Sequence, residues 1–178
     1  MKKVLCLALI GAMCFSFVGC AKEETKQVYD VSKTVGDKAA ETEAAPEAEK
    51  AVNVSDLAST LLNDVKYDDT LTEVDLDTAK MFLNFADVEI EEASIYESSG
   101  ATAEEIVVVK CKDSDSAAKA KTAFEQRVSE QTENFTDYVP SEVPKLKAAV
   151  IITSKEYAIL SVSADDAKAK EIIEGAFK

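Results

Sequence analysis

Residues 105–133 read EIVVVKCKDSDSAAKAKTAFEQRVSEQTE, and this stretch decides the fold. Its first eight residues, 105–112, contain a run of β-branched side chains that predicts a strand. Asp113 or Ser114 then caps a helix that reaches about Glu133, because apolar side chains recur on one helical face while charged side chains lie outside it. A strand that leads directly into an amphipathic helix indicates a mixed fold in which the helix packs on a sheet. The apolar positions of this helix are Ala117, Ala120, Phe124 and Val128.

The C-terminal part of the chain has the same order of elements. Residues 148–153 and 157–163 predict two strands joined by a tight turn, after which Asp165 or Asp166 caps a last amphipathic helix. A further strand is predicted over residues 88–97, upstream of the first stretch. The chain therefore contains two strand–strand–helix (ββα) units. They predict an α+β fold with a four-stranded antiparallel sheet and helices covering one of its faces.

One or two helices are expected before this sheet and should pack on it. Ser55 is a good N-cap for the first, and a second, shorter helix is expected after Asp77. Residues 66–71 are predicted to connect the two helices. Residues 135–144 contain two prolines and are predicted to be irregular. The folded part is therefore expected to be a single domain over residues 52–178.

The N-terminal residues are typical of a secretory signal. Two lysines precede a 15-residue apolar run, Val4 to Val18, which is shorter than the ~20 residues that span a membrane. The residues Phe17-Val18-Gly19-Cys20 resemble the lipobox of bacterial lipoproteins, with Phe17 in place of the usual Leu. The resemblance implies cleavage between Gly19 and Cys20 and a diacylglyceryl group on the Cys20 thiol. An uncleaved signal anchor is the alternative.

Composition separates the predicted signal peptide from the tether, and the net charge limits the kinds of partner that the protein can bind. Residues 1–19 form the predicted signal peptide, and residues 20–51, rich in Ala and Glu, predict a lipidated, acidic, disordered tether. The formal net charge of −14 becomes −16 when Lys2 and Lys3 leave with the signal. A nucleic-acid partner is not expected, because phosphates repel such an acidic protein.

The predicted lipid places the domain in the cell envelope. Two acyl chains hold a protein stably on a bilayer, so the predicted location is the extracytoplasmic face of the cell membrane. The expected partners are the membrane itself, through the lipid on Cys20, and an envelope protein or a wall component.

Residue types exclude several kinds of chemistry. The chain has no histidine, which excludes Ser-His-Asp and Cys-His catalysis. Cys111 is the one unmodified cysteine after the predicted processing, and its apolar neighbours predict a buried side chain. Gly100 and Gly175 are the only glycines after the tether, so no phosphate-binding loop can be written. The sequence therefore predicts no catalytic residue, no metal site and no cofactor, and the protein is not expected to be an enzyme.

Pairs of adjacent carboxylates are the remaining candidates for chemistry. General acid–base catalysis needs two carboxylates that face one cleft, whereas neighbours on a strand point to opposite faces. Structural, capping or solvating roles are therefore predicted, and weak divalent-cation binding is left open. The four pairs are Asp68-Asp69, Glu91-Glu92, Glu104-Glu105 and Asp165-Asp166.

Short motifs in the folded part carry a family resemblance. They are Tyr96 before SSGA (98–101), AEEI (103–106), Arg127, YVPSE (138–142) with Leu146, and the last strand pair. With these motifs, residues 93–173 resemble a family of uncharacterised lipoprotein domains from low-GC Gram-positive bacteria. The resemblance implies an extracytoplasmic domain without an assigned activity.

The resemblance also points to one candidate surface. If the family shares a site, Tyr138, Pro140 and Glu142 are the candidate interaction residues. A rigid corner fixed by Pro140 explains the same residues without a ligand. The leading hypothesis is a non-enzymatic binding or interaction module. The alternatives are a small-ligand carrier with a pocket beneath its helices and a wall-polymer hydrolase with two carboxylates roughly 5–9.5 Å apart.

Overall fold

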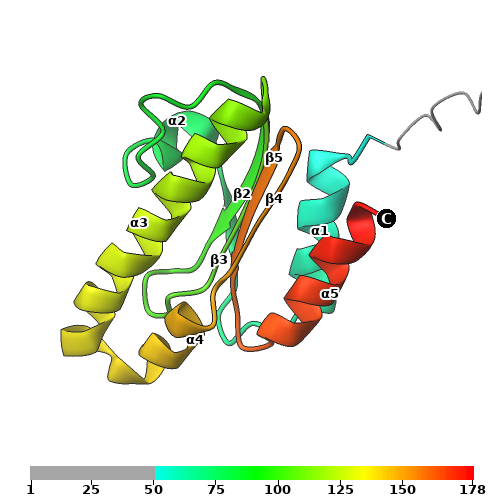
Figure 1. Cartoon of the computed structure of the whole chain (residues 1–178). Coiled ribbons are helices and arrows are strands. Elements are labelled where there is room, and N and C mark those ends of the chain that lie inside the picture. Colours follow the sequence, from blue (N-terminus) through cyan, green and yellow to red (C-terminus); the bar gives the residue numbers. More distant parts are fainter. Residues whose placement is uncertain (1–50) are drawn as a thin grey trace, which may run out of the picture. The chain divides into compact units, whose positions relative to one another are not determined.

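The computed structural model describes residues 51–178 (Figure 1). The predicted signal peptide, the lipidation site and the tether up to residue 50 lie outside the described residues. The elements, in chain order, are α1 (Val54–Asp64), β1 (Thr72–Val74), α2 (Leu76–Ala79), β2 (Ile90–Glu97), β3 (Glu105–Cys111), α3 (Ser114–Tyr138), η1 (Pro140–Glu142), α4 (Val143–Lys147), β4 (Val150–Ser154), β5 (Tyr157–Val162) and α5 (Asp166–Ala176).

The described strands form one antiparallel sheet in the order β1-β2-β3-β5-β4. The predicted α+β class and antiparallel pairing are confirmed. The predicted number of strands is not, because the sheet has five. The additional strand, β1, has three residues and pairs with β2, with Val74 opposite Ile95. A three-residue segment is too short for a recognisable alternation, so the pairing with β2 rather than its own sequence defines it.

Helices cover both faces of the sheet. Helices α1 and α5 pack on one face, and α3 packs on the other together with α2 and α4 (Figure 1). Alternate residues of β3 enter the two cores: Ile106 and Val108 on the α1 side, Val107 and Val109 on the α3 side. The expectation that helices would cover one face is therefore wrong. Because β3 is apolar on both of its faces, each face has to be covered.

The two ββα units are not related by symmetry. They are β2–β3–α3 and β4–β5–α5, and they join where β3 pairs antiparallel with β5. A twofold axis between two such hairpins would place both helices on the same face of the sheet. Helices α3 and α5 instead lie on opposite faces (Figure 1). The units therefore share an order of elements but not an arrangement.

Side-chain caps begin helices α1, α2, α3 and α5. Of the two candidates predicted at each helix, Asp113 caps α3 and Asp165 caps α5, each accepting a hydrogen bond from the backbone N–H three residues later, at 2.8 and 3.0 Å. Helix α1 begins earlier than predicted, because Asn53 rather than Ser55 is its N-cap and accepts at 2.9 Å. Asn and Ser are nearly equal as caps, so their identities did not distinguish the two positions.

Helix α3 is longer than predicted and ends at a corner. It continues to Tyr138, and Val139 leaves the helical conformation immediately before Pro140, as the steric demand of a following proline requires. Residues 135–144 were predicted to be irregular, but they contain the end of α3, the 3₁₀ turn η1 and the start of α4. Pro144 lies in the first turn of α4, where its missing N–H costs no hydrogen bond.

Candidate functional site

Charged side chains are buried around the β2–β3 hairpin. Glu104, the residue before β3, has an exposed fraction of 0%. Its carboxylate accepts hydrogen bonds from the backbone N–H groups of Asp68 and Asp69 at 2.9 Å. The Nζ of Lys145 lies 3.0 Å from Glu104 Oε1. Two amides and one ammonium therefore balance this buried charge, and they fix the α1–β1 connection against the hairpin.

Lys145 of α4 lies at the centre of this group, which we call the Lys145 cluster: Lys145, Asp68, Glu104 and Glu142. Its Nζ is 2.7 Å from Asp68 Oδ2 and 3.1 Å from Glu142 Oε2. Burial lowers the pKa of the ammonium, but the three carboxylates outweigh burial and hold the pKa above its ordinary value. Lys145 therefore stays charged and ties three separate segments of the chain together.

A second group lies on the side of the hairpin that faces α3. We call it the Arg127 cluster: Arg127, Glu97 and Glu105. Glu97 of β2 and Glu105 of β3 are directly opposite in the strand register. The Nη2 of Arg127 is 3.3 Å from Glu97 Oε2, and its Nε is 3.2 Å from Glu105 Oε2. One guanidinium thus bridges two carboxylates that belong to neighbouring strands.

The guanidinium of Arg127 is also held from its other sides. Its Cζ lies 4.7 Å above the ring centre of Phe82, within the range of a cation–π contact. The side-chain oxygen of Gln131, in the orientation that satisfies its hydrogen bonds, accepts from Arg127 Nη2 at 2.8 Å and Nη1 at 3.1 Å. Arg127 is therefore positioned by α3 itself and by the segment that precedes β2.

The Arg127 cluster carries unequal charges, with two carboxylates for one guanidinium. The side chains of Glu97 and Glu105 are 18% and 1% exposed. Burial and then the charge of Glu105 raise the pKa of Glu97 to about 9, although Arg127 opposes the rise. Strongly shifted groups occur both in functional sites and in structural ion networks. The pair is the main candidate for unusual chemistry in the described part of the chain.

The structure separates the three predicted interaction residues. Tyr138 is 73% exposed at the end of α3 and contacts Phe135, with 6.4 Å between their ring centres. Pro140 is also exposed, at the start of η1. Glu142 is buried, and its Oε2 accepts a hydrogen bond from the backbone N–H of Ala103 at 3.0 Å. Tyr138 and Pro140 are therefore available to a partner, whereas Glu142 holds the corner from inside.

The four pairs of adjacent acids have structural partners. Besides Glu104 and Glu105 in the two clusters, Asp69 accepts a hydrogen bond from the backbone N–H of Ser99 at 3.0 Å, and Glu91 forms an ion pair with Lys110 at 3.1 Å. The member of the last pair that caps α5 is Asp165. Among residues 51–178, no group of three or more Cys, Asp or Glu side chains is placed to hold a metal ion.

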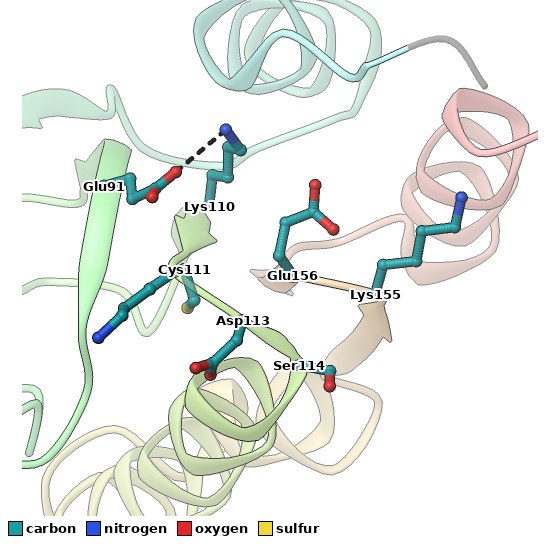
Figure 2. Close-up of a pocket in the computed structure, with 8 residues that line it drawn as sticks. Glu91, Lys110, Cys111, Asp113, Ser114, Lys155 and Glu156 are labelled. Carbon is teal, nitrogen blue, oxygen red and sulfur yellow. Dashed lines mark ion pairs between the residues drawn. The ribbon is translucent and has the colours of Figure 1, made fainter. Parts of the chain in front are cut away.

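An open hollow of about 410 Å³ lies where β3 ends and α3 begins. Figure 2 shows Glu91 and Lys110 joined at one side of it and Lys155, from the β4–β5 turn, at the other. Its lining includes three lysines and three acids, so it favours neither an anion nor a cation. The lining residues are Glu91, Lys110, Cys111, Lys112, Asp113, Ser114, Lys155 and Glu156.

Cys111 borders this hollow but is not a reactive thiol. Its exposed fraction is 0%, as the sequence predicts, and it belongs to the core on the α3 side. Burial, together with the charges of Asp113 and Glu91, raises the pKa of its thiol to about 11. Because the thiolate is the nucleophile, Cys111 remains in its unreactive form at neutral pH.

Sequence reasoning missed two residues of the clusters. Glu97 is the last residue of β2, and a hairpin register that places it opposite Glu105 would have found the pair. Lys145 carries no such signal. It is 41 residues from Glu104 in the chain, and only the corner between α3 and α4 brings it to the hairpin.

A family model described as a domain of unknown function, DUF4358, matches residues 63–174, more than half of the chain. No curated protein and no solved structure matches the chain. Within the described residues, no helix is both long enough and apolar enough to cross a bilayer.

Proposed function

The chain belongs to the DUF4358 family of domains of unknown function, and from that premise we propose that it is a non-enzymatic binding module of the cell envelope. A lipid on Cys20 anchors it at the extracytoplasmic face of the membrane, and residues 21–51 tether the folded domain to that anchor. The corner between α3 and α4, with Tyr138 and Pro140 outermost, contacts its partner, an envelope protein or a wall component.

The observation that carries the proposal is the exposure of Tyr138 on a rigid support. Tyr138 is 73% exposed, and a tyrosine is favoured at interfaces because it combines a large apolar area with a polar tip. The corner beneath it is held by Glu142, which binds Lys145 and the backbone of Ala103. An aromatic side chain on a preorganised corner loses little conformational freedom on binding.

The use of the buried acids supports a binding role over a catalytic one. The carboxylate of Glu104 accepts hydrogen bonds from two backbone amides and forms an ion pair with Lys145. Glu97 and Glu105 face each other beneath Arg127, with one side chain 18% and the other 1% exposed. A wall-polymer hydrolase would present two carboxylates to a cleft that admits a sugar chain.

Metabolic labelling with a fatty-acid analogue tests the anchor. We expect the label on the full-length protein in its bacterial host, and recovery of the protein with the membrane fraction. Cys20→Ser should abolish the label and release the protein from membranes. Cys111→Ser is the matched control and should retain both, because Cys111 is a buried core residue. Labelled Cys20→Ser protein would contradict the anchor.

In-cell cross-linking followed by mass spectrometry tests the partner surface. We expect one reproducible partner for the wild-type protein and at least a tenfold loss of cross-linked product for Tyr138→Ala. Met81→Ala is the matched control, since Met81 is another large apolar side chain, 84% exposed, that lies outside the corner. Equal loss for both variants, or turnover of a wall polymer by the purified protein, would contradict the proposal.

A further inference from the structure

The Arg127 cluster leaves one oxygen of each carboxylate without a protein partner. Arg127 binds Oε2 of Glu97 and Oε2 of Glu105. The Oε1 atoms of Glu97 and Glu105 are both buried and accept no hydrogen bond from the residues that the structure describes. Two ionised carboxylates in this position would leave a buried negative charge and two unsatisfied acceptors, and both are costly in a protein interior.

The groups around the pair supply no second cation. Helix α3 contributes Arg127 and the neutral Gln131. Across the sheet, Thr72 of β1 lies opposite Glu97, and Val162 of β5 lies opposite Glu105. The neighbouring Glu104 is engaged by Lys145. Within residues 51–178, Arg127 is the one cation with an ion pair to either carboxylate.

One proton resolves both problems. A protonated carboxyl group is a hydrogen-bond donor, whereas a carboxylate only accepts. The side chains of Glu97 and Glu105 lie within hydrogen-bonding reach of each other. A proton on one of them lets that side chain donate to the other, which puts a hydrogen bond in the place of two unpartnered acceptors. The cluster then contains one carboxylate and one guanidinium and is electrically neutral.

We propose that Glu97 and Glu105 share a single proton at neutral pH, and that this acid–carboxylate pair with Arg127 forms a proton-dependent latch that fastens the β2–β3 hairpin to α3. The raised pKa of Glu97, about 9, agrees with this geometry. Loss of the proton leaves two buried negative charges against one positive charge and loosens the hairpin from the helix.

Infrared spectroscopy of the full-length protein with isotope-labelled glutamate tests the latch directly. We expect the C=O stretch of a protonated carboxylic acid at pH 7 in the wild-type protein, and its disappearance as the pH is raised past about 9. Glu97→Gln and Glu105→Gln should each remove the band at pH 7. Glu92→Gln is the matched control, the same change at an exposed position of β2, and should retain it. Absence of the band from the wild-type protein at pH 7 would overturn the proposal.

Thermal unfolding supplies a second readout. An amide at position 97 donates an N–H to Glu105 at every pH and so replaces the proton permanently. The Tm of the wild-type protein should therefore fall between about pH 5 and pH 9, and that fall should be reduced at least twofold in Glu97→Gln but not in Glu92→Gln. An unchanged fall in Glu97→Gln would also overturn the proposal. The infrared titration of the wild-type protein decides the matter even if both pair variants fail to fold.

Discussion

At the scale of single residues, two buried charge clusters differ in how completely they are satisfied. Lys145 meets three carboxylates, and each of the buried ones also binds a backbone amide. Arg127 meets two carboxylates that retain unpartnered oxygens. The first cluster is therefore fully paired at neutral pH. The second depends on a proton and is the one that weakens as the pH rises above neutrality.

Removal of the Lys145 ammonium should be strongly destabilising. Lys145→Met keeps most of the apolar stem but leaves the buried carboxylates of Glu104 and Glu142 without a cation. Breaking a buried ion pair from one side costs about 3–5 kcal/mol, so we expect the free energy of unfolding in urea to fall by about 3 kcal/mol. Lys147→Met, an exposed change on the same helix, is the control and should stay within about 0.5 kcal/mol. A loss below ~1 kcal/mol for Lys145→Met would mean that the Lys145 cluster does not stabilise the fold.

Cys111 should react only when the core opens. Because burial raises the pKa of its thiol to about 11, alkylation by iodoacetamide at pH 7.5 should be at least tenfold slower in the folded protein than in concentrated urea. Peptide mapping by mass spectrometry separates Cys111 from the N-terminal cysteines. Rapid alkylation of the folded protein would show that the thiol is accessible and would contradict its place in the core.

At the scale of elements, the sequence predicted the strands and helix starts that a local run of residues defines. The β-branched run within residues 105–112 predicted β3. Asp113 or Ser114 and Asp165 or Asp166 were the predicted caps, because a side-chain acceptor suits the free N–H groups of a first helical turn, and the structure uses Asp113 and Asp165. Strand β1 and the Lys145 cluster escaped prediction, because each depends on a segment distant in the chain. Helix α3 was predicted too short, since in its last turn only Phe135 packs into the core and the other aromatic residue, Tyr138, is exposed.

The cap of α3 can be tested on its own. Asp113→Ala removes the acceptor for the N–H of Ser116, and loss of such a cap typically costs about 1 kcal/mol. We expect a loss of that size in the free energy of unfolding, measured in urea at pH 7. Ser114→Ala, at the exposed first position of the same helix, should change stability by less than ~0.5 kcal/mol. Equal losses in the two variants would show that any substitution at the start of α3 destabilises the protein, and that the cap hydrogen bond of Asp113 is not the cause.

At the scale of the whole molecule, acid residues set the response to pH from both directions. Hydrogen bonds or ion pairs hold the pKa of four aspartates below the ordinary value of 3.8, so their contribution to stability is present above that pH and is lost as the pH falls further. Glu97 acts in the opposite sense. Its pKa is raised in the folded protein, so its contribution is full below about 4.5 and is lost as the pH rises to about 9. The four aspartates are Asp68, Asp69, Asp75 and Asp113.

The two contributions predict a stability maximum on the acid side of neutrality. The Tm of the full-length protein, followed by circular dichroism from pH 2.5 to 9, should be highest at about pH 4.5 and should decline in both directions. Self-repulsion from a net charge of −14 adds to the alkaline decline, but molar salt screens exposed charges far more than buried ones. The part of the decline that survives in 1 M NaCl should therefore belong to Glu97 and be reduced in Glu97→Gln, while the acid decline persists in that variant. A Tm maximum near pH 8, or an alkaline decline that salt abolishes completely, would indicate that exposed charges rather than the buried Glu97–Glu105 pair cause the pH dependence.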